Sequence, residues 1–454
     1  MKLSYSFAKT LAPLCAAFLI ASCDHGEKTI EKPNIIFIMV DDMGYADISI
    51  HGRKDYQTPA IDSFFRQGMK FKNAYAAAPV CTPTRVAFMT GRYPARNETG
   101  LREPLTMSSL DAHIGLSPGI PTVSSLLHKN GYETVLFGKW HLGVNPESFP
   151  LKHGFDRFFG ITPGAADYID HKPFNIYGGK LIKGNAHVLY ENGEPVELEG
   201  YLTDLITDHA IDFIRKDHTK PFFLSLQYTA PHWPFQAPGS VPFADTTDFN
   251  VADAPDGFVG IMRNMDENLA RLFKAVKDAN LEESTMIIFT SDNGGERHSD
   301  MGPFKGSKMQ LWEGGVRVPA AVRWTGTIPA GTESEQPVIT MDWTVTILEA
   351  TGTEYPDTLS LDGIPLLTHL KEGGAVVPRK FYWRTSNRVR AHAYRDGDWK
   401  YLRTADGEFL FNLSEDPSED HDLHDSMKEK FDEMKKGFMD MDAEMLGPLI
   451  LTPG

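Results

Sequence analysis

Two pairs of polar residues could bind a metal ion, because each pair follows a short apolar run. Asp41 and Asp42 follow NIIFIMV, and Asp292 and Asn293 follow TMIIFT and one serine. Both runs predict buried strands. Three carboxylates and an amide offer oxygen ligands, which suit calcium or magnesium better than zinc. The alternative is that adjacent aspartates only form a turn.

Cationic and imidazole side chains follow two further predicted strands. Lys139 and His141 in GKWHLG come after TVLF, and His232 in APHWPF comes shortly after FFLSLQ. In an open parallel sheet, ligands bind beyond the carboxyl ends of the strands. We therefore expect these residues and the acidic pairs to converge on one cleft, whereas a lone lysine or histidine is more often structural.

The segment CTPTRVAFMTG starts at Cys81. Pro83 suits the first turn of a helix, which would place Cys81 near a helix amino terminus, where anions are favoured. Arg85 follows one turn later, within reach of the nucleophile or of a metal ligand. An isolated cysteine is usually a small buried hydrophobe, so the neighbouring residues decide how Cys81 is interpreted.

This segment resembles the signature of the type I sulfatases of the alkaline phosphatase superfamily, and the resemblance extends over nearly the whole chain from about residue 33. It implies that a formylglycine-generating enzyme or a radical maturase oxidises Cys81 to formylglycine. The hydrated aldehyde would be the nucleophile, with one hydroxyl attacking sulfur and loss of a proton from the other expelling sulfate. Without this modification Cys81 would be inert.

The resemblance also implies a ligand set for one calcium ion per chain. The ligands would be the formylglycine oxygen at position 81 and the side chains of Asp41, Asp42, Asp292 and Asn293. The ion would lower the pKa of the hydrate and bind one sulfate oxygen.

Lys308 joins the expected catalytic residues because it lies five residues before Glu313 in KMQLWEGG, the spacing that the sulfatase family shows. The roles that we assign are sulfate binding, orientation of the hydrate and protonation of the leaving group. Lys139 and Lys308 would bind sulfate, His141 would orient the hydrate, and His232 or Lys308 would protonate the leaving group. Arg85 would lie beside the nucleophile.

Residues for substrate specificity are harder to predict. Asp167, Asp170 and His171 lie in an expected loop and are the first candidates for substrate binding. Other polar or aromatic residues could line a sugar pocket or simply belong to loops; these are His51, His153, Tyr168 and Trp233.

The order of apolar runs and helical segments predicts an α/β fold with a large, mostly parallel sheet sandwiched by helices. Clear helical candidates are residues 203–216 and 260–277. We expect a catalytic domain over residues 33–372 and a subdomain over residues 373–454. The subdomain would hold a small antiparallel sheet (380–384, 390–394, 400–403 and 409–412), an acidic loop (414–422) and a helix from about Asp425.

The amino terminus predicts export. Residues 11–20 are apolar but too few to span a membrane, and they lead into LIASC, which resembles a bacterial lipoprotein box. We expect a signal peptide over residues 1–22, a lipid on Cys23 and a tether over residues 23–32, which would place the protein in the bacterial cell envelope. The alternative, an ordinary secretory signal, would also export it.

Cysteine content and charge narrow the functional classes. Cys15 and Cys23 fall in the predicted export segment, so the mature body has only Cys81 and no internal disulfide. A formal net charge of -16 argues against a nucleic-acid partner, and it means that an anion site must depend on local cations.

The predicted function is hydrolysis of O-sulfate from a carbohydrate, because an exported lipoprotein sits where a bacterium handles polymers. Two alternatives stay open. One is a phosphonate or phosphodiester hydrolase of the same superfamily, and the other is a glycan-binding lipoprotein without catalysis. The GKWHLG and Lys308 segments favour the sulfatase.

Overall fold

The computed structural model describes residues 1–4, 32–107, 111, 113–177, 180–243, 247–385 and 390–447. The described residues from Lys32 onward belong to one compact unit. Most of the predicted signal peptide (residues 5–22), the lipid site at Cys23 and nearly all of the tether lie outside the described residues. Within the described ranges, none of the helices combines the length and hydropathy that a membrane span needs.

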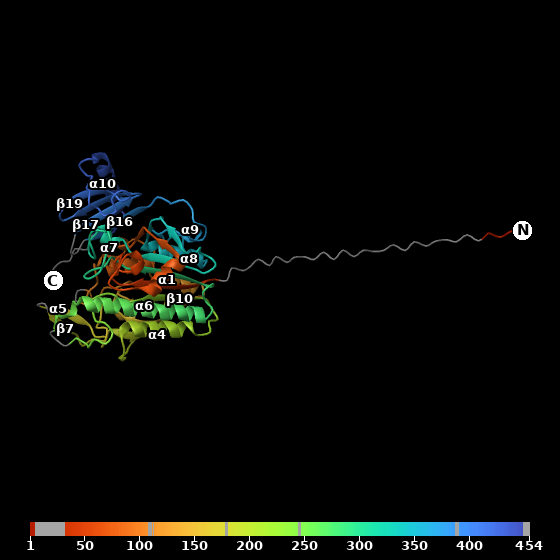
Figure 1. Cartoon of the computed structure of the whole chain (residues 1–454), viewed down its shortest axis with the longest axis horizontal. Coiled ribbons are helices and arrows are strands. Elements are labelled where there is room, and N and C mark those ends of the chain that lie inside the picture. The colour runs from red at the N-terminus through yellow and green to blue at the C-terminus, as the bar shows by residue number, and fades with distance from the viewer. Residues whose placement is uncertain are drawn as a thin grey trace. The chain divides into compact units, whose positions relative to one another are not determined.

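One large sheet forms the centre of the unit (Figure 1). Its described strands, in spatial order, are β14 (Thr332–Ser334), β2 (Met69–Phe71), β13 (Ala320–Arg323), β12 (Thr285–Ser291), β1 (Asn34–Val40), β10 (Phe222–Gln227), β4 (Glu133–Gly138), β5 (Arg157–Ile161), β8 (Leu189–Glu191) and β9 (Glu194–Pro195). The central strands from β12 to β5 are parallel, and β13 and β8 join them antiparallel. The sheet is therefore mixed at its edges.

Strand β1 is buried on both of its faces. Ile36, Ile38 and Val40 pack into one hydrophobic core, and the alternate residues Ile35 and Phe37 pack into another. A strand covered on both sides reads as a continuous apolar run, which explains NIIFIMV. Because β1 lies in the middle of the sheet, the residues that follow it lie near the centre of the side where the parallel strands end.

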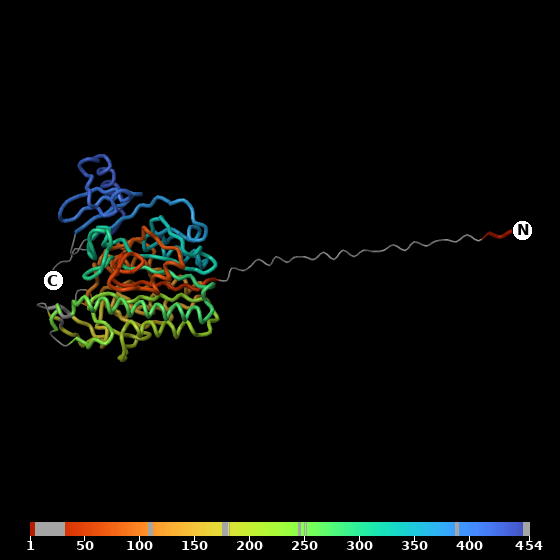
Figure 2. The backbone as a smooth tube through the Cα atoms, in the orientation of Figure 1, coloured from red at the N-terminus to blue at the C-terminus, as the bar shows by residue number. Residues whose placement is uncertain are grey.

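Helices cover both faces of this sheet. The first core contains α1 (Pro59–Gln67), α4 (Leu202–Ile214) and α6 (Pro255–Asp278), and the second contains α2 (Cys81–Thr90), α3 (Val123–Lys129) and α8 (Thr340–Ala350). In the view of Figure 2 the red-to-orange trace of the early strands and helices lies between the green trace that includes α6 and the blue-green trace that includes α8. The two helices predicted from periodicity correspond to α4 and α6.

The carboxyl-terminal part holds four antiparallel strands and a helix in its described residues. They are β16 (Lys380–Thr385), β17 (Ala391–Asp396), β18 (Trp399–Thr404), β19 (Gly407–Asn412) and α10 (Lys428–Asp442). A third core joins Trp383 and other residues of this part to Tyr75 of β3 and to residues of α2 and α8. The predicted fold class is confirmed, and the domain boundary at residue 372 stays a prediction.

Short elements complete the described chain. They are η1 (Ser49–His51), β3 (Ala74–Tyr75), η2 (Pro94–Arg96), η3 (Thr99–Leu101), η4 (Pro146–Ser148), η5 (Pro150–His153), β6 (Phe174–Tyr177), β7 (Lys180–Lys183), β11 (Thr247–Asp248), α5 (Phe249–Ala252), α7 (Glu313–Val316), β15 (Val338–Ile339) and α9 (Leu367–Glu372).

His153, at the end of η5, gives the fold a specific sensitivity to acid. Its side chain is buried 5.5 Å from the Trp140 ring, and burial lowers its pKa to about 4. The unfolded chain therefore binds a proton from about pH 6.5 downward while the folded chain does not, so stability is lost as pH falls from about 6.5 to about 4. We predict that His153→Leu removes roughly 3 kcal/mol of this pH-dependent loss.

Urea unfolding of the wild type and the variant at pH 7.5 and pH 4 measures this difference. His421→Leu is the control, because the His421 side chain is 83% exposed. An equal loss of unfolding free energy in the wild type and in His153→Leu would contradict the prediction.

Candidate active site

The two acidic pairs meet at the carboxyl ends of β1 and β12. These strands are parallel neighbours with Val40 opposite Ser291, so the residues that follow them leave the sheet side by side. The Asp42 N–H donates to Asp292 Oδ1 (3.1 Å), and Asn293 Nδ2 donates to Asp42 Oδ1 (2.7 Å). Asp42 has a φ of 65°, a left-handed conformation that is uncommon outside glycine and that occurs at functional sites.

Cys81 reaches this cluster from the amino terminus of α2. It is the first residue of the helix and is buried. Its sulfur and one carboxylate oxygen each from Asp41 and Asp292 all lie within 4.8 Å of one another. The cysteine and two of the predicted metal ligands therefore share one small space.

Arg85 ties α2 to the acidic cluster. Its Nε and Nη2 atoms donate to Asp292 Oδ2 at 3.0 and 2.8 Å, and its Nη1 atom donates to Gln227 Oε1 at 2.9 Å. Sequence reasoning missed Gln227, the last residue of β10. The available signal was a polar side chain at the end of an otherwise apolar strand.

Lys139 and His141 come from the turn after β4. Gly138 must be a glycine here, because its φ is 117° and a Cβ would lie 1.8 Å from the Gln227 carbonyl oxygen. Lys139 Nζ lies 2.6 Å from Asp41 Oδ2, and both side chains are fully buried. His141 Nε2 lies 3.0 Å from the Leu105 carbonyl oxygen, whereas its buried Nδ1 has no hydrogen-bond partner among the described residues.

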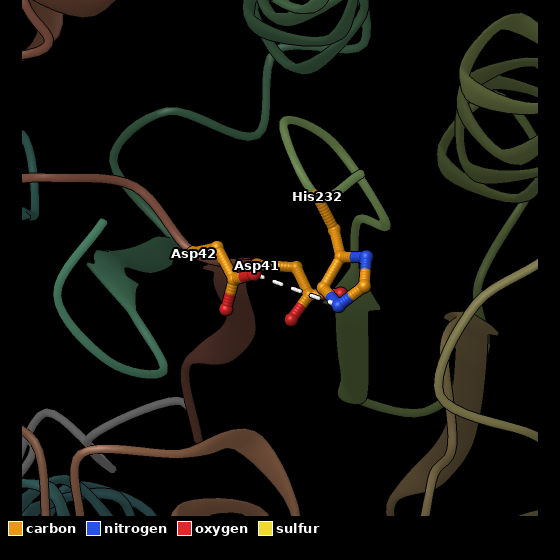
Figure 3. Close-up of side chains that lie close together, drawn as sticks. All are labelled: Asp41, Asp42 and His232. Atoms are coloured by element: carbon orange, nitrogen blue, oxygen red, sulfur yellow. Dashed lines mark ion pairs between the residues drawn. The ribbon is translucent and has the colours of Figure 1, made fainter. Parts of the chain in front are cut away.

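His232 and Lys308 close the other side of the cluster. Lys308 Nζ donates to Asp42 Oδ2 and lies 3.2 Å from His232 Nε2, which is 3.5 Å from the same carboxylate oxygen. Figure 3 shows the His232 ring on a separate loop, pointing toward Asp41 and Asp42 at the end of β1. Glu296, which sequence reasoning also missed, lies 3.7 Å from Lys308 Nζ.

Burial and charge set the protonation of this cluster. Burial, with the Asp41 carboxylate adding to it, raises the pKa of Asp292 to about 7. Burial opposes ionisation of Asp42 as well, but Lys308, His232 and Lys139 together hold its pKa below the usual range. Burial raises the pKa of the Cys81 thiol to about 11. The unmodified thiol is therefore neutral at physiological pH and a poor nucleophile.

Burial also affects the imidazoles. It lowers the pKa of His232 to about 4, with Lys308 adding to the effect, and it lowers the pKa of His141 well below its ordinary value. The Lys308 ammonium is buried too, but Asp42 and Glu296 hold its pKa above the usual range. The cluster as described therefore pairs neutral imidazoles with a charged lysine.

The acidic side chains fit a hard dication. Asp41 Oδ1 and Asn293 Oδ1 are buried and accept no hydrogen bond from any described residue. Buried polar atoms normally have a partner, and oxygen atoms of carboxylates and amides are the donors that calcium and magnesium take. The raised pKa of Asp292 agrees, because a cation among these carboxylates would relieve their mutual repulsion.

The residues considered for specificity lie in two different settings. Asp167 is buried and accepts hydrogen bonds from Ile169 N in its own loop and from Phe243 N, so it ties its loop to a distant segment. Asp170 and His171 line a cavity of about 610 Å³, where Asp170 pairs with Lys183. Their contact with substrate stays a prediction.

The remaining aromatic and histidine candidates are mostly internal. Tyr168 is buried, and its hydroxyl donates to the carbonyl oxygens of Thr229 and His232, at 2.9 and 3.0 Å. Trp233 packs edge-on against Phe174. His51 stacks on a tyrosine, and His153 lies in the second core region beside Trp140. Tyr168 thus holds the His232 loop in place through hydrogen bonds to its backbone.

Comparison with known proteins indicates the same class of protein as the geometry of the site does. Residues 33–353 match the family model described as Sulfatase, and residues 304–444 match the model described as N-sulphoglucosamine sulphohydrolase, C-terminal. N-acetylgalactosamine-6-sulfatase from Homo sapiens is 33% identical over 371 residues, which cover 78% of this chain and 69% of that protein. Arylsulfatase from Hemicentrotus pulcherrimus is 30% identical, covering 86% of this chain and 71% of that protein.

A solved structure, Ps i-CgsB, has a TM-score of 0.80 and 31% identity, covering 92% of this chain and 94% of that chain. Ps i-CgsB has also been solved in complex with k-i-k-neocarrahexaose. Fold and site thus define a hydrolase of sulfuric esters. The chain belongs to the sulfatase family.

The acidic cluster generates a binding prediction. Asp292→Asn removes one charged oxygen ligand, so we expect calcium to bind at least about tenfold more weakly than to the wild type. Isothermal titration of the metal-free proteins with calcium measures the change. Asp253→Asn is the matched control, because Asp253 pairs with Arg297 and His298 outside the cluster. Equal calcium affinity in the wild type and Asp292→Asn would place the ion elsewhere.

Proposed function

We propose that this protein removes O-sulfate groups from carbohydrates, using a formylglycine made from Cys81 and one calcium ion. The observation that carries the proposal is the position of Cys81 Sγ, within 4.8 Å of carboxylate oxygens of Asp41 and Asp292. A neutral, buried thiol beside carboxylates is unsuited to attack on a sulfate ester. Conversion by a formylglycine-generating enzyme or a radical maturase is therefore part of the proposal.

The relatives support a sugar substrate. One is named for N-acetylgalactosamine 6-sulfate chemistry, and Ps i-CgsB has been solved with k-i-k-neocarrahexaose. Both share about a third of their residues with this chain over most of its length. We therefore propose a sulfated polysaccharide, or an oligosaccharide derived from it, as the substrate class.

Asp41, Asp42, Asp292 and Asn293 would hold the calcium ion together with the oxygen of the modified residue 81. When present, the hydrated formylglycine supplies a hydroxyl nucleophile, and the ion supplies Lewis acidity and a position for one sulfate oxygen.

Charge balance in the cluster suits a sulfate ester, which carries one negative charge. Asp41 pairs with Lys139, Asp42 with Lys308 and Asp292 with Arg85, so each of these three carboxylates has a cationic partner. Glu296, beside Lys308, adds one further negative charge, so a dication and a singly charged sulfate ester can enter together without leaving a net charge buried. Lys139 and Lys308 are the cations that bind the remaining sulfate oxygens.

The other side chains handle orientation and protons. His141 has a buried Nδ1 without a partner among the described residues, which suits a contact to the modified residue 81. Arg85 fixes the Asp292 carboxylate beside it. His232 Nε2 and Lys308 Nζ lie 3.2 Å apart, so this pair can deliver a proton to the sugar oxygen as it leaves.

The first test is sulfate release by protein matured to formylglycine. The substrates are positionally defined sulfated saccharides, N-acetylgalactosamine 6-sulfate among them, with matching phosphate esters beside them. We predict turnover of at least one sugar sulfate and a loss of roughly 10³-fold or more in Cys81→Ala. His232→Ala should lose about 10²-fold or more, because it removes one member of the His232 and Lys308 pair that delivers the proton.

The control is the wild-type chain produced without a maturation enzyme, which has the same sequence but a thiol at position 81. It should be as inactive as Cys81→Ala. Full activity in the unmatured chain would overturn the formylglycine mechanism. Preference for the phosphate esters would make the protein a phosphoester hydrolase instead.

We also propose that the protein is exported and lipid-anchored through Cys23 in a bacterial envelope, which the LIASC sequence supports. We predict that Cys23→Ala abolishes incorporation of radiolabelled fatty acid and moves the protein out of the membrane fraction, whereas Cys15→Ala leaves both unchanged. Fatty acid incorporation that is equal in Cys23→Ala and the wild type would contradict this.

A further inference from the structure

The carboxyl-terminal sheet reaches the loop that carries Lys308 through one fully buried lysine. Lys400, on β18, has no solvent exposure, and its Nζ lies 2.9 Å from Glu313 Oε1 and 2.9 Å from Glu419 Oε1. Glu313 is also fully buried. Three ionisable side chains, from β18, from α7 and from the acidic loop after β19, therefore meet away from water.

Glu313 is held on every side. The Tyr75 hydroxyl donates to its Oε2 (2.6 Å), Arg317 Nη1 lies 3.3 Å from the same oxygen, and its backbone N–H donates to Glu419 Oε2 (2.6 Å). Burial opposes its ionisation, but Lys400, Arg317 and Arg395 hold its pKa at about 2. Glu313 is thus a fixed, ionised anchor between the two parts of the fold.

Glu313 lies near the carboxyl end of the segment that carries Lys308. We define this segment, residues 305–316, as the Lys308 loop. Its ends are closed by the Gly314 N–H donating to the Lys305 carbonyl oxygen (2.7 Å). Its middle is attached by the N–H of Lys308 donating to Gly295 O and that of Met309 donating to Pro79 O, both at 2.8 Å. Those backbone contacts lie beside the Asn293 and Cys81 segments.

Close packing beside Glu313 also restricts the position of the Lys308 loop. A Cβ on Gly294 would lie 1.9 Å from the Gly314 carbonyl oxygen, so the residue after Glu313 is packed directly against the segment after Asn293. A displacement of Glu313 must therefore be transmitted to the Lys308 loop. Lys308 Nζ in turn contacts Asp42 and His232, the groups at the site.

A buried ion cluster is a poor way to gain stability, because desolvation of the charges offsets their attraction. Apolar side chains of similar volume would stabilise this junction at least as well. What the charges add is a defined position, since Lys400 Nζ pairs with Glu313 and Glu419 together and so fixes where Glu313 must lie.

We infer that Lys400 is a positioning residue for leaving-group protonation, acting through Glu313 to hold the Lys308 loop in register with His232. This inference rests on the proposed function, in which the Lys308 and His232 pair delivers a proton from nitrogen to the departing sugar oxygen. It gives the carboxyl-terminal subdomain a role in the reaction, although Lys400 itself touches no substrate.

The test compares leaving groups. A sugar alkoxide needs protonation as it leaves, whereas 4-nitrophenolate leaves without it. In matured Lys400→Met we expect kcat on the sugar sulfate to fall by about tenfold or more, and kcat on 4-nitrophenyl sulfate to fall by less than about threefold. Lys435→Met is the matched control, because Lys435 pairs with Glu408 on the exposed side of the same subdomain.

Equal losses on the two substrates, or no loss on either, would overturn the inference, because a purely structural residue lowers both rates in proportion to the folded fraction. If Lys400→Met does not fold, Tyr75→Phe decides, since it removes only the hydroxyl that donates to Glu313 and accepts from Arg395. It should shift the ratio of the two rates in the same direction, and an unchanged ratio would refute the inference. Absence of sulfate turnover in the matured wild type would instead refute the proposed function.

Discussion

Three buried carboxylates lie beside one another at the centre of this protein, and most of the site follows from that constraint. Asp41, Asp42 and Asp292 have almost no solvent exposure. Carboxylates this close repel one another unless cations stand among them. Lys139, Lys308 and Arg85 each pair with one of them, and the oxygen atoms that accept no hydrogen bond are those that a dication would take. The site is therefore built to hold positive charge and, with it, an anionic substrate.

The fold makes this arrangement possible because parallel strands end at one edge of the sheet. The residues after β1, β4, β10 and β12 come from widely separated parts of the sequence, but neighbouring strands deliver them to one place. Asp42 and His141 have left-handed φ angles, so the backbone accepts strain to aim these side chains. Helix α2 then brings Cys81 to the same place with its amino terminus, where backbone N–H groups favour oxyanions.

Much of this could be predicted from the sequence, because the informative residues are local. Apolar runs ending in Asp41 and Asp292 mark the central strands, and Cys81, Pro83 and Arg85 mark a helix start with chemistry on one side. The mixed edges of the sheet were not predictable, since β2, β13 and β14 are too short to show a pattern.

Partners that depend on tertiary contacts were also missed. Gln227 meets Arg85 from a position 142 residues away, and Lys400 meets Glu313 across 87 residues. Neither contact has a local signature. The cavity beside Asp170 and His171 shows the same limit, because loop geometry rather than residue type decides which polar side chains face it.

The central claim is that a modified residue 81 and a calcium ion share the acidic cluster, and a crystal structure of the matured protein grown with calcium tests it most directly. Anomalous scattering should place the ion at about 2.3–2.6 Å from oxygen atoms of Asp41, Asp42, Asp292 and Asn293 and from an oxygen on residue 81. An ion bound elsewhere, or an intact thiol at position 81 in crystals of protein that releases sulfate, would contradict the account.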